Sequence, residues 1–219
     1  MKKALIFYGG WEGHTPNETA AVFEGWLKDE GYNVVKSDDL KILNDYEAIA
    51  DVDLFVPMCT MSEMSEEQAK NISLAVSNGA GIAGCHGGMC DSFRNNTLWQ
   101  FMTGAQWVAH PGNSDVTYTV NLKYGNQFTE GLSDFDYTGE QYYMHIDPAV
   151  TVHATTAFPV FDGEHASNGT VLMPVIFTKK WGKGNVFYLS IGHTYKDFDI
   201  PQVKTIMKRG LLWATKKGE

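Results

Sequence analysis

The sequence predicts a single α/β domain that has a mostly parallel sheet, helices on both faces and an antiparallel extension in its second half. In the first half, short apolar segments alternate with amphipathic helical segments, and this order gives right-handed crossovers and parallel strands. Beyond about residue 105 this pattern loosens, and apolar and polar residues alternate over 115–122, which is typical of an antiparallel or edge strand. Because we find no repeat and no Pro- or Ser-rich linker, we expect one domain over residues 1–219.

Local signals place the elements of the first half. Thr15-Pro16-Asn17-Glu18 and Ser65-Glu66-Glu67-Gln68 have the pattern of capping boxes that begin two helices. Gly31 and Asn78-Gly79 are placed to end those helices. A continuous apolar segment that suits a strand buried on both faces lies at 3–8, and further short strands are expected at 33–36, 53–57 and 80–84, the last rich in glycine.

The second half has weaker signals. A final helix is expected from Pro201, because Val203, Ile206, Met207 and Leu211 give it an apolar face. Strands are expected at 115–122, 141–145, 150–154, 171–178 and 186–191.

Charge and composition restrict the class of partner. The chain has 17 Lys and Arg against 26 Asp and Glu, a formal net charge of −9, which argues against nucleic acid and anionic membranes. We expect a small carbohydrate as the partner and, given the absence of an apolar run of ~18 residues or of a signal-peptide pattern, a cytoplasmic location. A homodimer is compatible with the aromatic content, although no interface can be placed.

The three cysteines, Cys59, Cys85 and Cys90, form neither a disulfide framework nor a zinc motif. The segment 84–88 does not match the G-x-G-x-x-G pattern of dinucleotide-binding proteins, so a nicotinamide cofactor is not expected. The sequence by itself requires no cofactor.

Three histidines follow expected strands. His14 comes after strand 3–8, His86 after strand 80–84 and His193 after strand 186–191. Ligands of open parallel sheets bind beyond the carboxyl ends of the strands. We therefore expect the three imidazoles to lie at one edge of the sheet.

The segment Gly84-Cys85-His86-Gly87-Gly88 has the form of a strand-to-helix elbow, in which small neighbours let the central side chain project from a strained turn. Hydrolases place a nucleophile there, whereas this chain has His86, which suits a general base, a metal ligand or a hydrogen-bond donor. Cys85 is expected to pack inward. A nucleophilic Cys85 is the alternative.

Two further clusters supply polar and aromatic groups. Glu140 is the best-placed acid for a base or a ligand, with a solvated surface carboxylate as its alternative. Candidates for catalysis are His86, Glu140 and His193. Candidates for substrate contact are His14, Trp107, His110, Tyr142 and Trp11. A zinc ion is a further hypothesis, because imidazoles and a carboxylate suit it, with candidates His14, His86, Glu140 and His193. No H-E-x-x-H pair is present, so such a site would come from distant segments.

The order and spacing of several segments resemble the ThuA-like (trehalose utilisation) proteins. These segments are 3–10 with His14, 84–88, 128–132, 139–142 and 184–193. The resemblance implies a flavodoxin-like fold of the class I glutamine amidotransferase type and a link to trehalose or a related disaccharide. It also implies that His14, His86, Glu140 and His193 belong to the polar site. Glutamine hydrolysis is not expected, because His86 replaces the elbow cysteine and no His-x-Glu pair occurs at His193.

These observations leave two hypotheses for function. The first is an enzyme (a hydrolase, lyase or isomerase) that performs acid–base chemistry on a disaccharide or a keto-sugar. An ordinary glycosidase is disfavoured, because two carboxylates flanking a bond are not evident. The second is a sugar-binding or regulatory module that has lost the nucleophilic cysteine.

Overall fold

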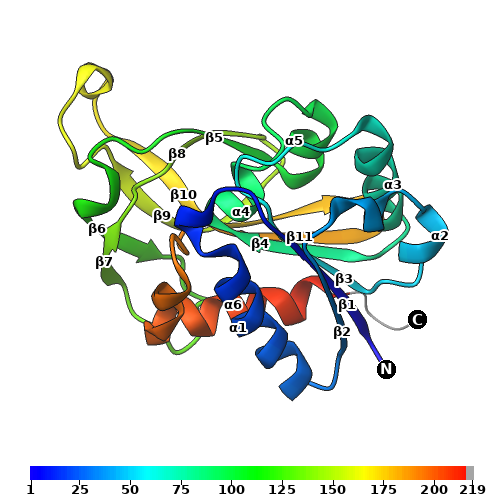
Figure 1. Ribbon diagram of the computed structural model, residues 1–219. Helices are drawn as coiled ribbons and strands as arrows, with labels where there is room; N and C mark the ends of the chain where they lie inside the picture. The colour runs from blue at the N-terminus through cyan, green and yellow to red at the C-terminus, as the bar shows by residue number, and fades with distance from the viewer. Residues whose placement is uncertain (216–219) are drawn as a thin grey trace.

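A computed structural model describes residues 1–215 of the chain, and these residues contain a nine-stranded mixed sheet (Figure 1). The strand order is β2-β1-β3-β4-β11-β10-β9-β6-β7. The first five strands are parallel, in the order of a flavodoxin-like doubly wound sheet. They are β1 (Lys3–Tyr8), β2 (Asn33–Ser37), β3 (Leu54–Met58), β4 (Gly81–Cys85) and β11 (Gly184–Leu189).

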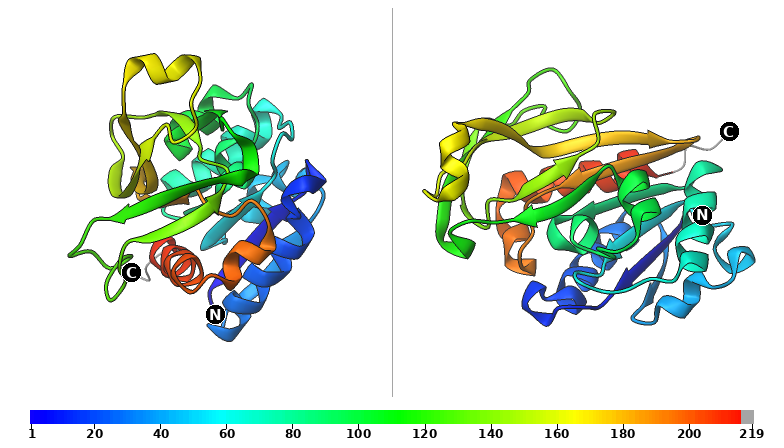
Figure 2. Two further views of the ribbon diagram at one scale, coloured as in Figure 1. Left: turned by 90° about the vertical axis from the view of Figure 1, so that its left-hand side faces the viewer. Right: turned by 90° about the horizontal axis from the view of Figure 1, so that it is seen from above.

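The remaining strands of the sheet are antiparallel, which confirms the predicted extension. They are β10 (Val171–Trp181), β9 (Thr151–Phe158), β6 (Val116–Leu122) and β7 (Phe135–Gly139). A separate two-stranded sheet pairs β5 (Ala105–Ala109) with β8 (Tyr143–Ile146). Strands β5 and β7 were not predicted, and the strand expected at 141–145 begins only at Tyr143. The segment 159–170, yellow in Figure 2, projects from the antiparallel half.

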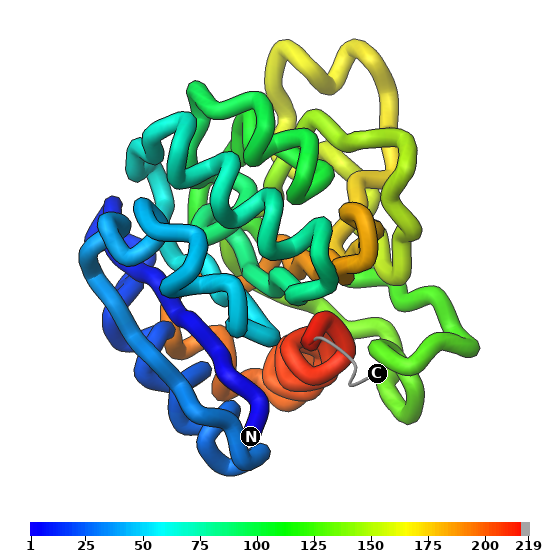
Figure 3. Tube along the Cα trace, turned by 90° about the vertical axis from the view of Figure 1, so that its right-hand side faces the viewer, coloured from blue at the N-terminus to red at the C-terminus, as the bar shows by residue number. Residues whose placement is uncertain are grey.

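Helices cover both faces of the parallel half, as predicted (Figures 1 and 3). Helices α1 (Pro16–Asp29) and α6 (Pro201–Ala214) pack on one face. Helices α2 (Tyr46–Ile49), α3 (Glu66–Ser77) and α5 (Thr97–Thr103) pack on the other. Within residues 1–215, none of the helices combines the length and the apolar character that a membrane crossing requires. Shorter helical segments are α4 (His86–Cys90) and the 3-10 turns Glu12–His14, Leu40–Leu43, Asn113–Asp115, Glu164–Asn168 and Tyr195–Asp199.

The continuous apolar character of β1 follows from burial on both of its faces. Ala4 and Ile6 belong to the core under α1 and α6, whereas Leu5 and Phe7 belong to the core under α3. Side chains of a strand point alternately to its two faces, so a strand between two helical layers needs apolar residues at every position. Burial of one large apolar side chain contributes about 1.5–3 kcal/mol.

The two expected capping boxes have different outcomes. Ser65 and Gln68 form the predicted reciprocal box at the start of α3. The prediction for Thr15 is wrong: this residue adopts a left-handed conformation with φ of 45°, and its side chain makes no capping hydrogen bond within the described residues. Its Oγ1 instead accepts a hydrogen bond of 3.0 Å from the backbone N–H of Tyr195. This contact ties the chain after His14 to the loop after His193.

Candidate active site

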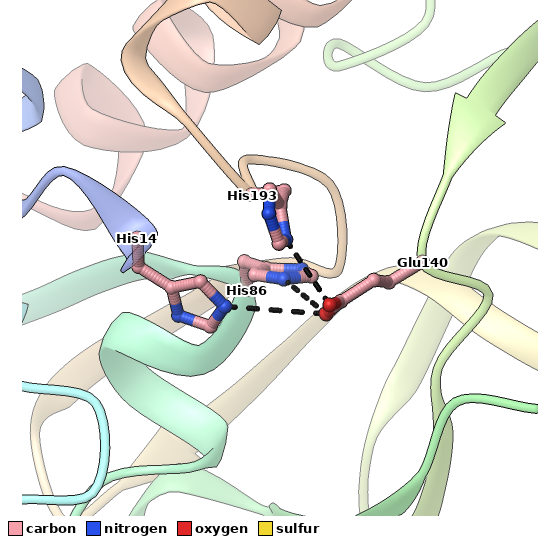
Figure 4. Close-up of side chains that lie close together, drawn as sticks. All are labelled: His14, His86, Glu140 and His193. Atoms are coloured by element: carbon pink, nitrogen blue, oxygen red, sulfur yellow. Dashed lines mark hydrogen bonds and ion pairs between the residues drawn. The ribbon is translucent and has the colours of Figure 1, made fainter. Parts of the chain in front are cut away.

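Four side chains from distant segments meet at the carboxyl edge of the parallel strands (Figure 4). His14, His86 and His193 follow β1, β4 and β11, and Glu140 follows β7 directly. One nitrogen or oxygen atom of each lies within 4.8 Å of those of the others. The exposed fractions of His14, His86 and Glu140 are 6%, 1% and 5%. We call these four residues the His3Glu cluster.

The Glu140 carboxylate lies at the centre of the cluster. Its Oε2 is 3.0 Å from His86 Nε2 and 4.0 Å from His14 Nε2. Its Oε1 is 3.2 Å from His193 Nδ1. A fourth imidazole, His110, approaches Oε1 with its Nε2 at 3.9 Å. Several imidazole nitrogens therefore face one carboxylate.

His86 is held by the elbow and by its neighbours. Its φ of 45° lies in the left-handed region, the strained turn that the glycine-rich motif predicts. Its Nδ1 donates a hydrogen bond of 2.8 Å to the carbonyl of Ser190. The ring of Tyr142 stacks on it at 4.0 Å between centroids, and Tyr188 donates to its carbonyl oxygen. These contacts direct Nε2 at Glu140.

His14 is oriented by Thr60 and accommodated by a glycine of the elbow. Its Nδ1 lies 2.8 Å from Thr60 Oγ1, which leaves Nε2 facing Glu140. A Cβ atom at Gly87 would lie 2.6 Å from His14 Cε1 and 2.9 Å from the Thr60 methyl group. Gly87 is therefore required for this imidazole to pack on the elbow.

His193 completes the cluster from the loop after β11. The preceding Gly192 has a φ of +132°, and a Cβ there would contact Cys85 Sγ at 3.0 Å. Although His193 Nδ1 is close to Glu140 Oε1, the contact is not aligned as a hydrogen bond. This buried nitrogen has no hydrogen-bond partner among residues 1–215.

Burial and neighbouring side chains shift the pKa values of three residues of the cluster. Burial, with the neighbouring imidazoles of His86 and His193, lowers the pKa of His14 to about 2, so this ring is neutral at physiological pH. Burial opposes ionisation of Glu140, but the facing His193 and His86 outweigh it and hold the pKa of the carboxyl well below its usual range. The Glu140 carboxylate raises the pKa of His193 against the effect of burial.

The donor set fits a divalent metal ion. Because the carbonyl of Ser190 can only accept, His86 Nδ1 carries a hydrogen. If the ring holds no second proton, its Nε2 presents a lone pair to an oxygen of the Glu140 carboxylate. Two such atoms 3.0 Å apart need a proton or a cation between them. Zinc ligands at roughly 2.0–2.2 Å from the ion leave neighbouring donors roughly 3.3–3.6 Å apart in a tetrahedron. The observed separations lie on either side of that range: 3.0 Å from Glu140 Oε2 to His86, 3.2 Å from Oε1 to His193 and 4.0 Å from Oε2 to His14.

The sequence matches the ThuA family, described as "Trehalose utilisation", over residues 3–214. The chain belongs to the ThuA family. No curated protein shows significant sequence similarity to it.

Solved structures share the fold of this ThuA-family chain. A ThuA-like protein from Bacteroides uniformis superposes with a TM-score of 0.77 at 16% identity, covering 97% of this chain and 91% of that one. A ThuA-like protein from Parabacteroides merdae gives 0.74 at 16% identity, covering 100% and 92%. A cytoplasmic protein from Salmonella typhimurium gives 0.68 at 13% identity, covering 98% and 100%. At these identities the similarity shows the fold alone.

The other predicted substrate contacts of this ThuA-family chain form an aromatic rim beside the cluster, and these side chains differ in their exposure to solvent. The rim consists of Trp11, Trp107, His110 and Tyr142. Trp11 is 47% exposed, and its ring lies 4.7 Å from that of His14. Trp107 packs beside His110 at 5.3 Å between centroids. Tyr142 is only 3% exposed and packs on His86, so in this structure it positions an imidazole. Contact of these residues with a substrate stays a prediction.

Cys85 has the environment of an inert thiol. It is fully buried, and burial raises the pKa of its thiol, so the nucleophilic thiolate is disfavoured. The inward packing predicted from the elbow is confirmed. The ThuA-family elbow thus presents an imidazole to the site and turns its cysteine into the core.

Sequence reasoning missed the residues that orient the cluster. Thr60 follows β3, so the same strand-end rule that located the histidines could have found it. Ser190 acts through its backbone carbonyl, for which the side-chain identity gives no signal. Asp91 and Arg94 form an ion pair, and the Arg94 guanidinium lies 4.7 Å over the Trp107 ring. No sequence motif marks this pair.

Proposed function

We propose that this ThuA-family protein is an enzyme of carbohydrate metabolism that performs acid–base chemistry on trehalose, a related disaccharide or a keto-sugar. The chemistry takes place at the His3Glu cluster, which holds one divalent metal ion, and zinc suits the donor set best. The observation that carries the proposal is the convergence of three imidazole nitrogens and one carboxylate within 4.8 Å.

The donor chemistry supports the metal part of the proposal. Neutral imidazoles and a carboxylate are ligands of Zn²⁺, and the hydrogen bonds from His86 to Ser190 and between His14 and Thr60 have the form of contacts that orient metal-bound histidines. A bound ion would polarise a sugar oxygen or lower the pKa of a water molecule.

His110 is the group in position to move a proton. It lies at the edge of the cluster with its side chain 27% exposed, and its Nε2 is 3.9 Å from Glu140 Oε1. Its buried Nδ1 lacks a hydrogen-bond partner among the described residues. An imidazole in such a place can exchange a proton with a substrate hydroxyl or an acidic C–H group. Its ring, with the face of Trp11, would also orient the sugar.

The sugar part of the proposal is supported by the family, by the charge and by the rim. The family is described by trehalose utilisation. A net charge of −9 disfavours an anionic substrate. Trp11 and Trp107 supply aromatic faces, and Trp107 Nε1 is a buried donor without a partner among residues 1–215. A sugar hydroxyl would satisfy such a donor.

Metal analysis of protein purified without a polyhistidine tag tests the metal part. We expect about one zinc ion per chain, with strong loss in Glu140→Gln and His193→Ala, because zinc sites built from protein side chains bind their ion tightly. The matched control is His145→Ala, since His145 is an exposed histidine of β8 outside the cluster. A metal content below about 0.1 equivalent in the wild-type protein would exclude this part.

Turnover of disaccharides and keto-disaccharides tests the enzymatic part. We expect His86→Ala and Glu140→Gln to abolish turnover while circular dichroism shows a retained fold. His110→Ala should lower kcat about 10²–10⁴-fold if it transfers the proton. The buried Cys85 favours a second candidate, a sugar-binding module without a nucleophile. Sugar binding by metal-loaded protein without any product would support that candidate instead.

A further inference from the structure

A cavity of about 330 Å³ lies between the loop after β3 and the loop after α4. This volume falls within the roughly 300–1,000 Å³ typical of small-molecule sites. The cavity is a separate feature from the His3Glu cluster and from the aromatic rim. Its lining includes Met61, Ser62, Glu63, Phe93, Arg94 and Asn95.

The cavity adjoins the His3Glu cluster through consecutive residues. Thr60 binds His14, and the next residue, Met61, lines the cavity. The Met61 N–H donates to the Asp91 carbonyl at 2.9 Å, and the Phe93 N–H donates to the Ser62 carbonyl at 3.1 Å. The two loops are therefore fastened together where the cavity meets the site.

Arg94 connects the cavity to the aromatic side of the cluster. Its Nε and Nη2 donate to the buried Asp91 carboxylate at 2.6 and 2.9 Å, and its guanidinium lies over Trp107. Trp107 packs near Tyr142, the residue stacked on His86. Arg94 therefore lies between Trp107 and the cavity that it lines, where its Nη1 can donate to a ligand.

The backbone around the cavity is held in an unusual conformation. Met61 and Phe93 have φ values of 60° and 52°, a region that side chains other than glycine rarely adopt. Backbone strain of this kind gathers at ligand sites. Both strained residues line the cavity, so its shape is specified by the surrounding contacts.

We infer that this cavity binds the second ring of a disaccharide whose first ring lies at the His3Glu cluster; the inference rests on the proposed function. Ser62 and Asn95 supply hydroxyl and amide groups, Glu63 accepts from hydroxyls, and Met61 and Met64 supply apolar surface for a C–H face of the ring. The carboxylates of Glu63 and Glu66 in the lining disfavour a phosphorylated sugar. The ligand is therefore a neutral glycoside of at least two units.

Binding of two probes, trehalose and methyl α-D-glucopyranoside, to metal-loaded protein tests the inference by ligand-observed NMR. We expect trehalose to bind the wild-type protein about ten-fold more tightly, because only trehalose has a second ring. Asn95→Trp fills the cavity at an exposed position and should bring trehalose to within about two-fold of the monosaccharide, whose affinity stays unchanged. The matched control is Asn33→Trp, an exposed position at the amino end of β2, which should change neither affinity.

The other outcomes separate the inference from the proposed function. Equal binding of the two probes by the wild-type protein, or an unchanged preference for trehalose in Asn95→Trp, would overturn the second-ring subsite and leave the sugar function standing. Failure of both probes to bind the folded, metal-loaded wild-type protein would overturn the subsite and the proposed sugar substrate together.

Discussion

At the residue scale, the chemistry of the site depends on which nitrogen each imidazole presents to Glu140. His86 and His14 each use Nδ1 for a protein contact, with Ser190 and Thr60, and both direct Nε2 at the carboxylate. The contact made by one ring nitrogen sets the tautomer and the basicity of the other. The residues behind the cluster therefore control its affinity for a cation.

Replacing Thr60 by valine tests this control. Thr60→Val keeps the shape of the side chain but removes the oxygen that faces His14 Nδ1. We expect the affinity for zinc, measured by competition with a chelator, to fall about 10–100-fold. Thr117→Val, which alters an exposed threonine paired with Thr138, should leave the affinity unchanged. Wild-type affinity in Thr60→Val would show that the contact of Thr60 with His14 does not control binding of the ion.

At the scale of elements, a buried lysine joins β10 to the neighbouring segments. Lys179 is 7% exposed, its Nζ lies 2.7 Å from Asp147 Oδ2, and it donates to the Phe101 carbonyl near the end of α5. The rings of Phe101 and Trp181 flank the ammonium group. Lys179 thus fastens α5 and the chain after β8 to the large sheet.

Replacing Asp147 by asparagine should destabilise this junction. Asp147→Asn leaves the buried ammonium group without its counter-charge, and we expect a loss of about 1–3 kcal/mol in the free energy of unfolding at pH 7, measured with urea. The control is Asp51→Asn, whose partner Lys3 lies in a more exposed ion pair, with an expected change below about 0.5 kcal/mol.

The effect of Asp147 has a defined pH dependence. Lys179 lowers the pKa of the Asp147 carboxyl below its ordinary value of 3.8. The stabilisation is therefore fully present above that value and is lost as the pH falls through the lowered pKa, where the wild-type carboxylate becomes protonated. The difference between wild type and Asp147→Asn should accordingly shrink in strong acid. A constant difference at all pH values would contradict an electrostatic role.

At the scale of the whole molecule, the cluster joins the two halves of the sheet. His14, His86 and His193 follow parallel strands, whereas Glu140 follows β7 at the far edge of the antiparallel half. The unfolded chain cannot bring residues so distant in sequence together at low cost. An ion bound by all four residues would therefore favour the folded state.

Removal of the metal should lower the thermal stability of the protein. Free metal at a thousand times its Kd stabilises by about 4 kcal/mol, and a domain of this size shifts its Tm by about 2–4 °C per kcal/mol. We expect a chelator to lower the Tm by about 10 °C and added zinc to restore it. The Tm of the double variant Glu140→Gln/His193→Ala should change neither with the chelator nor with added zinc. An unchanged Tm of metal-loaded wild type after chelation would contradict binding by the cluster.

Local sequence patterns were sufficient to predict the alternation of strands and helices in the first half and the strand-end positions of His14, His86 and His193. These features follow from local periodicity and from the rule that parallel strands end at one edge of a sheet. The sequence also indicated the strained elbow at His86, because the flanking glycines are a local signal.

Other features of the site and the fold depend on contacts between distant elements and could not be predicted from local patterns. The burial of Tyr142, the role of Thr60 and the use of Thr15 as an acceptor for Tyr195 all depend on residues far away in the chain. Strand β7 is short, and the alternating burial of its side chains depends on its antiparallel pairing with β6. The periodicity of a sequence indicates which face of a helix or strand is apolar. The hydrogen-bond partner of a polar atom, in contrast, depends on how distant elements pack, and a local pattern contains no information about that packing.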